Sequence, residues 1–232
     1  MNRLSRRTML AVVLVAAAGI PACQPAKAPE ITADDVVKKA SDALKTVTAV
    51  HFKLASTDGN MSIGSGLFAN TIEGDVVKPD RLKGTAKGTF GKVTVEIGFV
   101  VVGTRQYITN PLTKTWQALP EAGAAPNLLD PDHGAAVLLT KAQNLKKLAN
   151  ETIAGIECYH LTADIPAGLV AGLVGANGST NALASDLWIA LSDGLPRQIH
   201  LVGTVTADEP PKIQRTLELS SFNESIAIDA PI

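Results

Sequence analysis

Residues 81–103 contain two adjacent stretches in which apolar and polar side chains alternate with a period of two. One face of the second stretch, 91–103, carries Val93, Val95, Ile97, Phe99 and Val101. Lys92, Thr94 and Glu96 fall on the other face, which is the pattern of a strand in a sheet with one face in water. The first stretch, 81–90, alternates in the same way, but its less polar face consists of Leu82, Gly84, Ala86, Gly88 and Phe90.

The small residues on this face leave volume that protein interiors do not normally leave unfilled. A closely packed helix or a β-bulge would account for Gly84, Ala86 and Gly88. The other interpretation is that something other than protein fills the space. These two strands alone leave both interpretations open, and the remaining sequence favours a ligand.

The N-terminal residues 1–22 are predicted to be a signal peptide. Arg3, Arg6 and Arg7 precede an apolar run over 9–20 that is too short to span a bilayer. Cys23 follows Ile20-Pro21-Ala22, an arrangement similar to a bacterial lipobox, so we expect Cys23 to be lipidated and 23–31 to be a tether. The alternative is a secreted protein with an unmodified cysteine.

Residues 32–232 are expected to form one domain. Thr32 and Asp35 predict the start of an amphipathic helix, and a second helix is expected over 128–145, with Asp130 as its N-cap. Short links between about ten alternating segments indicate an antiparallel meander. The predicted fold class is α+β: a large curved antiparallel sheet, or half-barrel, with helices across its concave face enclosing a hydrophobic cavity.

The sequence contains none of the common catalytic motifs, and its four histidines lack the spacing of metal ligands. We therefore predict no catalytic residues, no metal and no cofactor. Without the signal peptide the net charge is about −4, and no basic patch is interleaved with aromatic residues, so no nucleic-acid partner is expected. Cys158 is expected to be a buried thiol.

The predicted interior is aliphatic and almost free of charge, which suits acyl chains. The expected wall of the cavity consists of Phe68, Ile72, Gly84, Ala86, Gly88, Val93, Val95, Ile97, Phe99, Leu138 and Leu139. The charge-free, glycine-containing segment 166–175 is either a short core helix or an entrance and lid. The residues expected to form that entrance or lid are Leu169, Val170, Leu173 and Val174.

Several segments resemble the mycobacterial LppX/LprA/LprF/LprG lipoprotein family. They are the lipobox, DDVVKKASDALKTVTAVHFKL, FVVVGTRQYI, and LLDPDHGAAVLLTKAQN followed by ETIAGIECYHLTADIP. The most specific piece is Leu129, Asp130, Pro131, Asp132 and Gly134. The resemblance covers 31–232 and implies a fold similar to the LolA and LolB carriers, a cavity for multiply acylated lipids, and no catalytic residues.

Together these features predict a lipoprotein that binds acylated lipids or glycolipids with two to four acyl chains and carries them across the cell envelope. We expect it to be held at the outer side of the cytoplasmic membrane by its lipid anchor, with partial release to the cell wall, and to have a membrane transporter as a further partner. The alternative is an anchored module that docks on an envelope protein and holds no lipid. That alternative predicts a filled core.

Overall fold

The structure is a computed structural model that describes residues 30–63, 66–120, 128–130, 132–173 and 180–232. The chain divides into two compact units, Met1–Glu30 and Ile31–Ile232. The helices, strands and buried cores described below all belong to the second unit.

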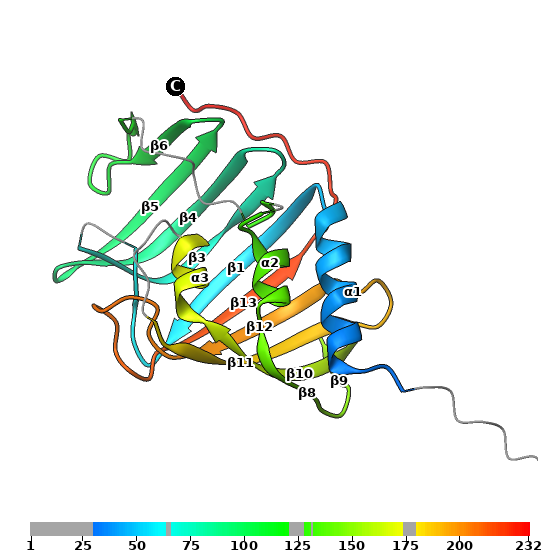
Figure 1. Ribbon diagram of the computed structural model, residues 1–232. Coiled ribbons are helices and arrows are strands. Elements are labelled where there is room, and N and C mark those ends of the chain that lie inside the picture. The colour runs from blue at the N-terminus through cyan, green and yellow to red at the C-terminus, as the bar shows by residue number, and fades with distance from the viewer. Residues whose placement is uncertain (1–29, 64–65, 121–127, 131, 174–179) are drawn as a thin grey trace, which may run out of the picture. The chain divides into compact units, whose positions relative to one another are not determined.

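Thirteen strands of this unit form one antiparallel sheet, which curves and stays open (Figure 1). The strand order is β7-β6-β5-β4-β3-β1-β13-β12-β11-β10-β8, with β2 paired to β3 and β9 paired to β10. The first strands are β1 (Ala49–Thr57), β2 (Met61–Ser62), β3 (Leu67–Val77), β4 (Arg81–Phe90), β5 (Val93–Val102), β6 (Arg105–Thr109) and β7 (Trp116–Ala118). The others are β8 (Gln143–Lys147), β9 (Glu151–Ile153), β10 (Ile156–Pro166), β11 (Ala182–Ala190), β12 (Pro196–Val202) and β13 (Gln214–Ser220).

The predicted fold class is confirmed. The sheet has more strands than the sequence indicated for two reasons. Strands β2 and β9 have only two or three residues each, too few to show an alternation, and residues 143–147, expected to be helical, form β8.

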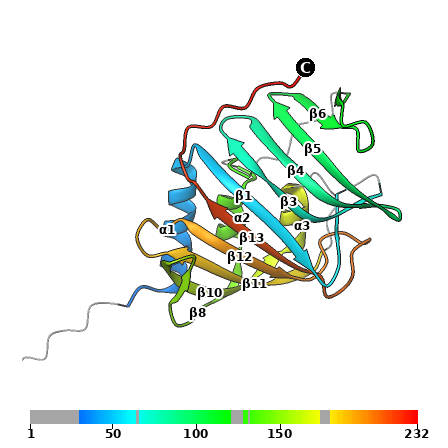
Figure 2. The same cartoon turned by 180° about the vertical axis from the view of Figure 1, so that it is seen from behind.

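Three helices lie across one face of the sheet: α1 (Ala33–Thr46), α2 (Ala135–Thr140) and α3 (Ala167–Leu173). Seen from behind, the sheet stands in front of all three (Figure 2). Buried side chains of the helices and of the concave face belong to one core cluster, which includes Val36, Leu139 and Leu187. A smaller cluster around Val100, Tyr107 and Ile228 packs separately from it.

The N-terminus of α1 is fixed as the sequence predicts. The Asp35 backbone N–H donates to Thr32 Oγ1 at 3.2 Å, and the Thr32 backbone N–H donates to Asp35 Oδ2 at 3.3 Å. This capping box satisfies two N–H groups that the first helical turn would otherwise leave without partners. Val36, Val37, Ala40 and Leu44 then form the buried stripe, so the amphipathic helix is confirmed.

The predicted helix over 128–145 is wrong in extent. Only Ala135–Thr140 is helical, and Gln143–Lys147 forms β8, which pairs with β10. Asp130 does not cap this helix, because its Oδ1 accepts from the backbone N–H groups of Asp132 and His133 at 2.8 and 2.7 Å and so closes a turn before it. Pro131 lies outside the described residues.

Pairing with the sheet edge overrides the helical pattern beyond Thr140. The Asn144 backbone has φ +53°, which a helix does not allow. The apolar residues 137–139 therefore belong to a helix of less than two turns, Ala135–Thr140.

Two glycines of β4 are explained by neighbouring protein atoms. A Cβ on Gly84 would lie 2.4 Å from the Glu73 carbonyl oxygen of β3 and 2.7 Å from Phe99 Cζ of β5, so this glycine makes room for both neighbouring strands. A Cβ on Gly88 would lie 1.9 Å from the Phe68 carbonyl oxygen, where β3 carries a bulge between Ala69 and Thr71. At these positions the close approach of protein, rather than a ligand, requires glycine.

Substituting Gly88 by alanine should lower the free energy of unfolding by roughly 1–3 kcal/mol, because the added methyl group forces β3 and β4 apart. Gly172 in α3 is the matched control, since its added Cβ would meet nothing within 4 Å. Gly172→Ala should be neutral or stabilise by up to about 1 kcal/mol. Chemical denaturation of both variants measures the difference, and equal stabilities would contradict the bulge argument.

Candidate functional site

A cavity of about 220 Å³ lies between the concave face of the sheet and the helices. Strand residues lining it are Phe52, Leu54, Ile72, Val76, Leu82, Phe99, Ile165, Ile199, Leu201, Arg215 and Leu217. The remaining wall residues are Leu128, Ala135, Leu138, Leu139, Val170 and Leu173. All of them except Arg215 are apolar, so the cavity favours a hydrocarbon over a polar ligand.

The floor of the cavity is built by strand register. Leu54 on β1 pairs with Ile72 on β3 and, on its other side, with Leu217 on β13. Leu217 in turn pairs with Ile199 on β12. Because directly paired residues point to the same face of a sheet, these four side chains form one apolar row across four strands.

The structure brings some of the predicted site residues together. Six of them line the cavity: Ile72, Phe99, Leu138, Leu139, Val170 and Leu173. Sequence reasoning missed Phe52 and Leu54, although their alternation with His51 and Lys53 was a usable signal. Nothing in the sequence pattern pointed to Arg215.

The other predicted residues lie elsewhere. Phe68 is off the cavity face because the bulge after Ala69 inverts the alternation, so that Ala69 packs beside Ile72 instead. Ala86 and Ile97 are buried on the face of Ile72, to which Ala86 is directly paired, but they do not line the cavity.

The other predicted site residues that the structure describes also lie outside the cavity wall. Val93 and Val95 lie near the start of β5, and Val93 is 56% exposed beside the turn that joins β4 to β5. Leu169 on α3 is half-buried outside the cavity wall. Gly84 and Gly88 are the two glycines already accounted for by Phe99 and the bulge, and Val174 lies outside the described residues.

Arg215 is the one charged residue of the cavity wall, and it forms a buried ion pair with Glu209. The two side chains are only 4% and 2% exposed. Arg215 Nη1 also donates to the Gly203 carbonyl at 2.7 Å, and Glu209 Oε2 accepts from the Val205 backbone N–H at 2.7 Å. The pair thus fastens the loop between β12 and β13 to the cavity wall.

Two opposing effects act on the pKa of Glu209. Burial alone would raise it, but the ion pair and hydrogen bond from Arg215 and the N–H groups of Val205 and Thr206 outweigh burial and hold the pKa below the ordinary glutamate value. A lowered folded-state pKa stabilises the fold above the unfolded-state value, and this stabilisation is lost as the pH falls through the folded-state pKa.

Glu209→Gln should therefore lower the free energy of unfolding at neutral pH by about 2–5 kcal/mol, because it leaves the buried Arg215 charge without a counter-ion. The unmodified protein should lose stability as the pH falls from about 5 to about 3, and the variant should lose less over the same interval. Denaturation curves at several pH values measure both slopes. Parallel pH dependence of the two proteins would contradict the assignment.

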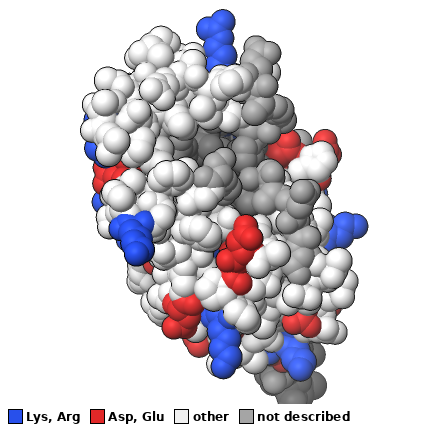
Figure 3. Space-filling view, turned by 90° about the vertical axis from the view of Figure 1, so that its left-hand side faces the viewer, with Lys and Arg blue, Asp and Glu red and all other residues white. Residues whose placement is uncertain are grey.

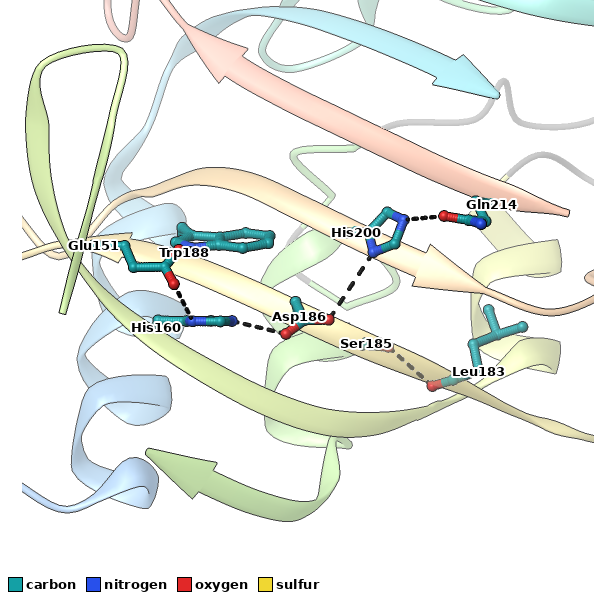
Figure 4. A network of polar contacts seen from close by, with 8 residues as sticks. All are labelled: Glu151, His160, Leu183, Ser185, Asp186, Trp188, His200 and Gln214. Atoms are coloured by element: carbon teal, nitrogen blue, oxygen red, sulfur yellow. Dashed lines mark hydrogen bonds and ion pairs between the residues drawn. The ribbon is translucent and has the colours of Figure 1, made fainter. Parts of the chain in front are cut away.

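The opposite face of the sheet carries a polar network around His160 (Figure 4). His160 Nδ1 lies 3.2 Å from Glu151 Oε1, its Nε2 lies 2.7 Å from Asp186 Oδ1, and its ring stacks on Trp188 with centroids 4.6 Å apart. Both ring nitrogens are therefore engaged by carboxylates.

The nearby Ser185 hydroxyl does not complete a nucleophile–base pair with His160. It donates to the Leu183 carbonyl at 2.9 Å. In the part of the chain that the structure describes, no three His, Cys, Asp or Glu side chains gather as metal ligands would. Cys158 is buried, and burial raises the pKa of its thiol. We therefore interpret the network as structural. It joins β9 to β11, and His200 on β12, whose Nδ1 lies 4.0 Å from Asp186 Oδ2, extends it by one strand.

Residues 32–228 match the LppX_LprAFG lipoprotein family. The chain belongs to this family. Among described residues, no helix is long and apolar enough to cross a membrane.

Known proteins of this kind resemble the chain over most of its length. It is 25% identical to the lipoprotein LprA of Mycobacterium tuberculosis over 205 residues, which cover 85% of this chain and 80% of LprA. The crystal structure of LprF from Mycobacterium bovis superposes with a TM-score of 0.68 at 18% identity, covering 86% of this chain and 96% of LprF. For LppX of Mycobacterium tuberculosis the TM-score is 0.62 at 22% identity, covering 85% and 98%. The family and the fold class expected from the sequence are both confirmed.

Proposed function

We propose that Ile31–Ile232 binds the acyl chains of envelope lipids in the cavity between the sheet and its helices, and that the protein carries these lipids across the cell envelope. The observation that supports this most strongly is the composition of the cavity wall, in which Arg215 is the single residue that is not apolar among those the structure describes. A wall of this kind offers acyl chains a favourable environment and offers water few hydrogen-bonding partners.

The expected affinity comes from removing hydrocarbon from water. Each buried methylene contributes roughly 0.8 kcal/mol before the costs of ordering the ligand. Phe52 and Phe99 add two aromatic rings to an otherwise aliphatic wall. Binding of this kind depends on chain length more than on a specific contact to the head group.

The cavity volume bears on the number of acyl chains. At about 220 Å³ it is below the roughly 300–1,000 Å³ of typical ligand pockets, so a lipid with two to four chains requires the helices to move away from the sheet. Helix α3 is suited to this because Gly168 and Gly172 are both exposed. A Cβ on Gly172 would meet no atom within 4 Å, so this side of α3 faces open space, while Ala167 and Ala171 on its other side are buried.

The wall supports binding without catalysis. Its one polar side chain, Arg215, is paired with Glu209 and provides neither a nucleophile nor a general base. The alternative of a lipid-free docking module predicted a filled core, and a cavity of this size disfavours it. We further propose that Cys23 carries the lipid anchor on the outer side of the cytoplasmic membrane, with residues 24–30 as a tether.

Leu217→Trp should reduce lipid binding at least tenfold, because the indole would fill the space above the centre of the cavity floor (about 1.4 kcal/mol per factor of ten). Glu218→Trp is the matched control: the neighbouring residue of β13 is exposed on the opposite face, so the same side chain is added outside the cavity. Titration with a fluorescent fatty acid measures both dissociation constants.

The comparison requires that both variants remain folded, which circular dichroism and thermal melting would establish. Unchanged binding by a folded Leu217→Trp variant would show that the ligand does not occupy this cavity. Equal loss in both variants would show that the effect is not local to the concave face.

A further inference from the structure

Four of the seven exposed large apolar side chains in the described residues lie at the same end of the sheet. Their exposed fractions are 37% for Ile63, 55% for Phe90, 56% for Val93 and 83% for Leu112. The other three, Leu119, Leu148 and Ile232, lie elsewhere. We call Ile63, Phe90, Val93 and Leu112 the apolar end.

Strand register brings these residues together. The Ile63 backbone N–H donates to the Leu67 carbonyl at 3.0 Å, Leu67 pairs with Phe90, and Phe90 pairs with Val93 across the turn between β4 and β5. The turn that contains Leu112 lies beside β5, since Lys114 Nζ donates to the Glu96 carbonyl at 3.0 Å.

The turns of the apolar end also carry positive charge. Residues 87–97 and 109–116 contain Lys87, Lys92 and Lys114, against Glu96 as their one acidic residue. Lys92 is exposed in the turn itself, between Phe90 and Val93. Lys87 Nζ lies 3.6 Å from Glu96 Oε2, so this ion pair leaves the charges of Lys92 and Lys114 unbalanced within these residues. Apolar side chains next to these two lysines complement a surface that presents anionic head groups above hydrocarbon.

Figure 1 shows the turn between β4 and β5 at the left-hand side, and Figure 3 views the molecule from that side. Uncharged surface covers much of the upper left of this view.

A bilayer fits these observations better than a protein partner does. A stable protein interface buries about 800 Å² on each partner over a continuous, well-packed patch. The apolar end instead offers single side chains at the tips of separate turns, with Leu112 83% exposed. Such side chains can enter the boundary between head groups and acyl chains without a complementary surface.

We propose that the apolar end docks the folded unit on the surface of an anionic lipid bilayer, beside which lipid passes between membrane and cavity. Its purpose rests on the proposed lipid-carrier function. Docking itself does not require an occupied cavity, so the two can be tested separately.

The test uses Ile31–Ile232, which contains every described helix, strand and core cluster and lacks Cys23. Sedimentation with vesicles of phosphatidylcholine and phosphatidylglycerol measures its partition coefficient, with pure phosphatidylcholine vesicles for comparison. Combined substitution of Phe90→Ser, Val93→Ser and Leu112→Ser should lower partitioning about tenfold or more. The matched control, Leu148→Ser with Ile232→Ser, should leave it unchanged.

A charge variant tests the choice of anionic lipid. Lys92→Glu with Lys114→Glu should lower partitioning about tenfold or more on vesicles that contain phosphatidylglycerol, and much less on pure phosphatidylcholine. The difference between the two vesicle types should shrink as salt is added.

Equal vesicle binding by the unmodified unit and the triple serine variant would overturn the proposal, as would no vesicle binding by the unmodified unit. A third outcome would also overturn the proposal: the unmodified unit does not bind vesicles but self-associates as its concentration rises, and the serine substitutions abolish this association. That result would identify the apolar end as a protein interface. Uptake of a dispersed fluorescent fatty acid separates docking from function: the triple variant should keep it. Vesicle binding without any fatty-acid uptake would support docking while contradicting the lipid-carrier function.

Discussion

The pairing of β13 with β1 is the interaction on which the rest of the structure depends. It joins residues 214–220 to residues 51–57 in antiparallel register and unites the strands from both ends of the chain in a single sheet. Leu54 and Leu217 face each other across this pairing and form the middle of the cavity floor. Arg215, on the same strand, fastens the loop between β12 and β13 to the cavity wall through Glu209. The fold and the candidate site therefore have the same central contact.

A cavity persists above this floor because the helices that cover it are short. At about 1.5 Å per residue, α2 and α3 are each roughly 10 Å long, whereas β3, β4 and β5 extend over about 30 Å. Two such helices cannot bury the whole concave face of the sheet. Side chains that these helices do not cover, among them Leu54, Ile72 and Leu217, are only half-buried and line the cavity.

Local signals in the sequence predicted the parts of the fold that local interactions determine. Thr32 and Asp35 correctly placed the start of α1, and the alternation of β4 and β5 correctly predicted their pairing. The site was predicted less well, because one bulge in β3 moved Phe68 off the cavity face, and because pairing with β10 made residues 143–147 a strand. The Arg215–Glu209 pair depends on how the loop after β12 folds back, which no periodicity records. Gly84 and Gly88 showed correctly that something approaches β4 closely, but the sequence could not distinguish a ligand from Phe99 and the β3 backbone.

The central claim is that the cavity holds the acyl chains of a lipid. Native mass spectrometry of Ile31–Ile232 purified from an actinobacterial host, followed by lipid extraction, tests it most directly. The account predicts an added mass at close to one lipid per chain, which Leu217→Trp removes and Glu218→Trp retains. Protein of bare mass that takes up no lipid on incubation would contradict it.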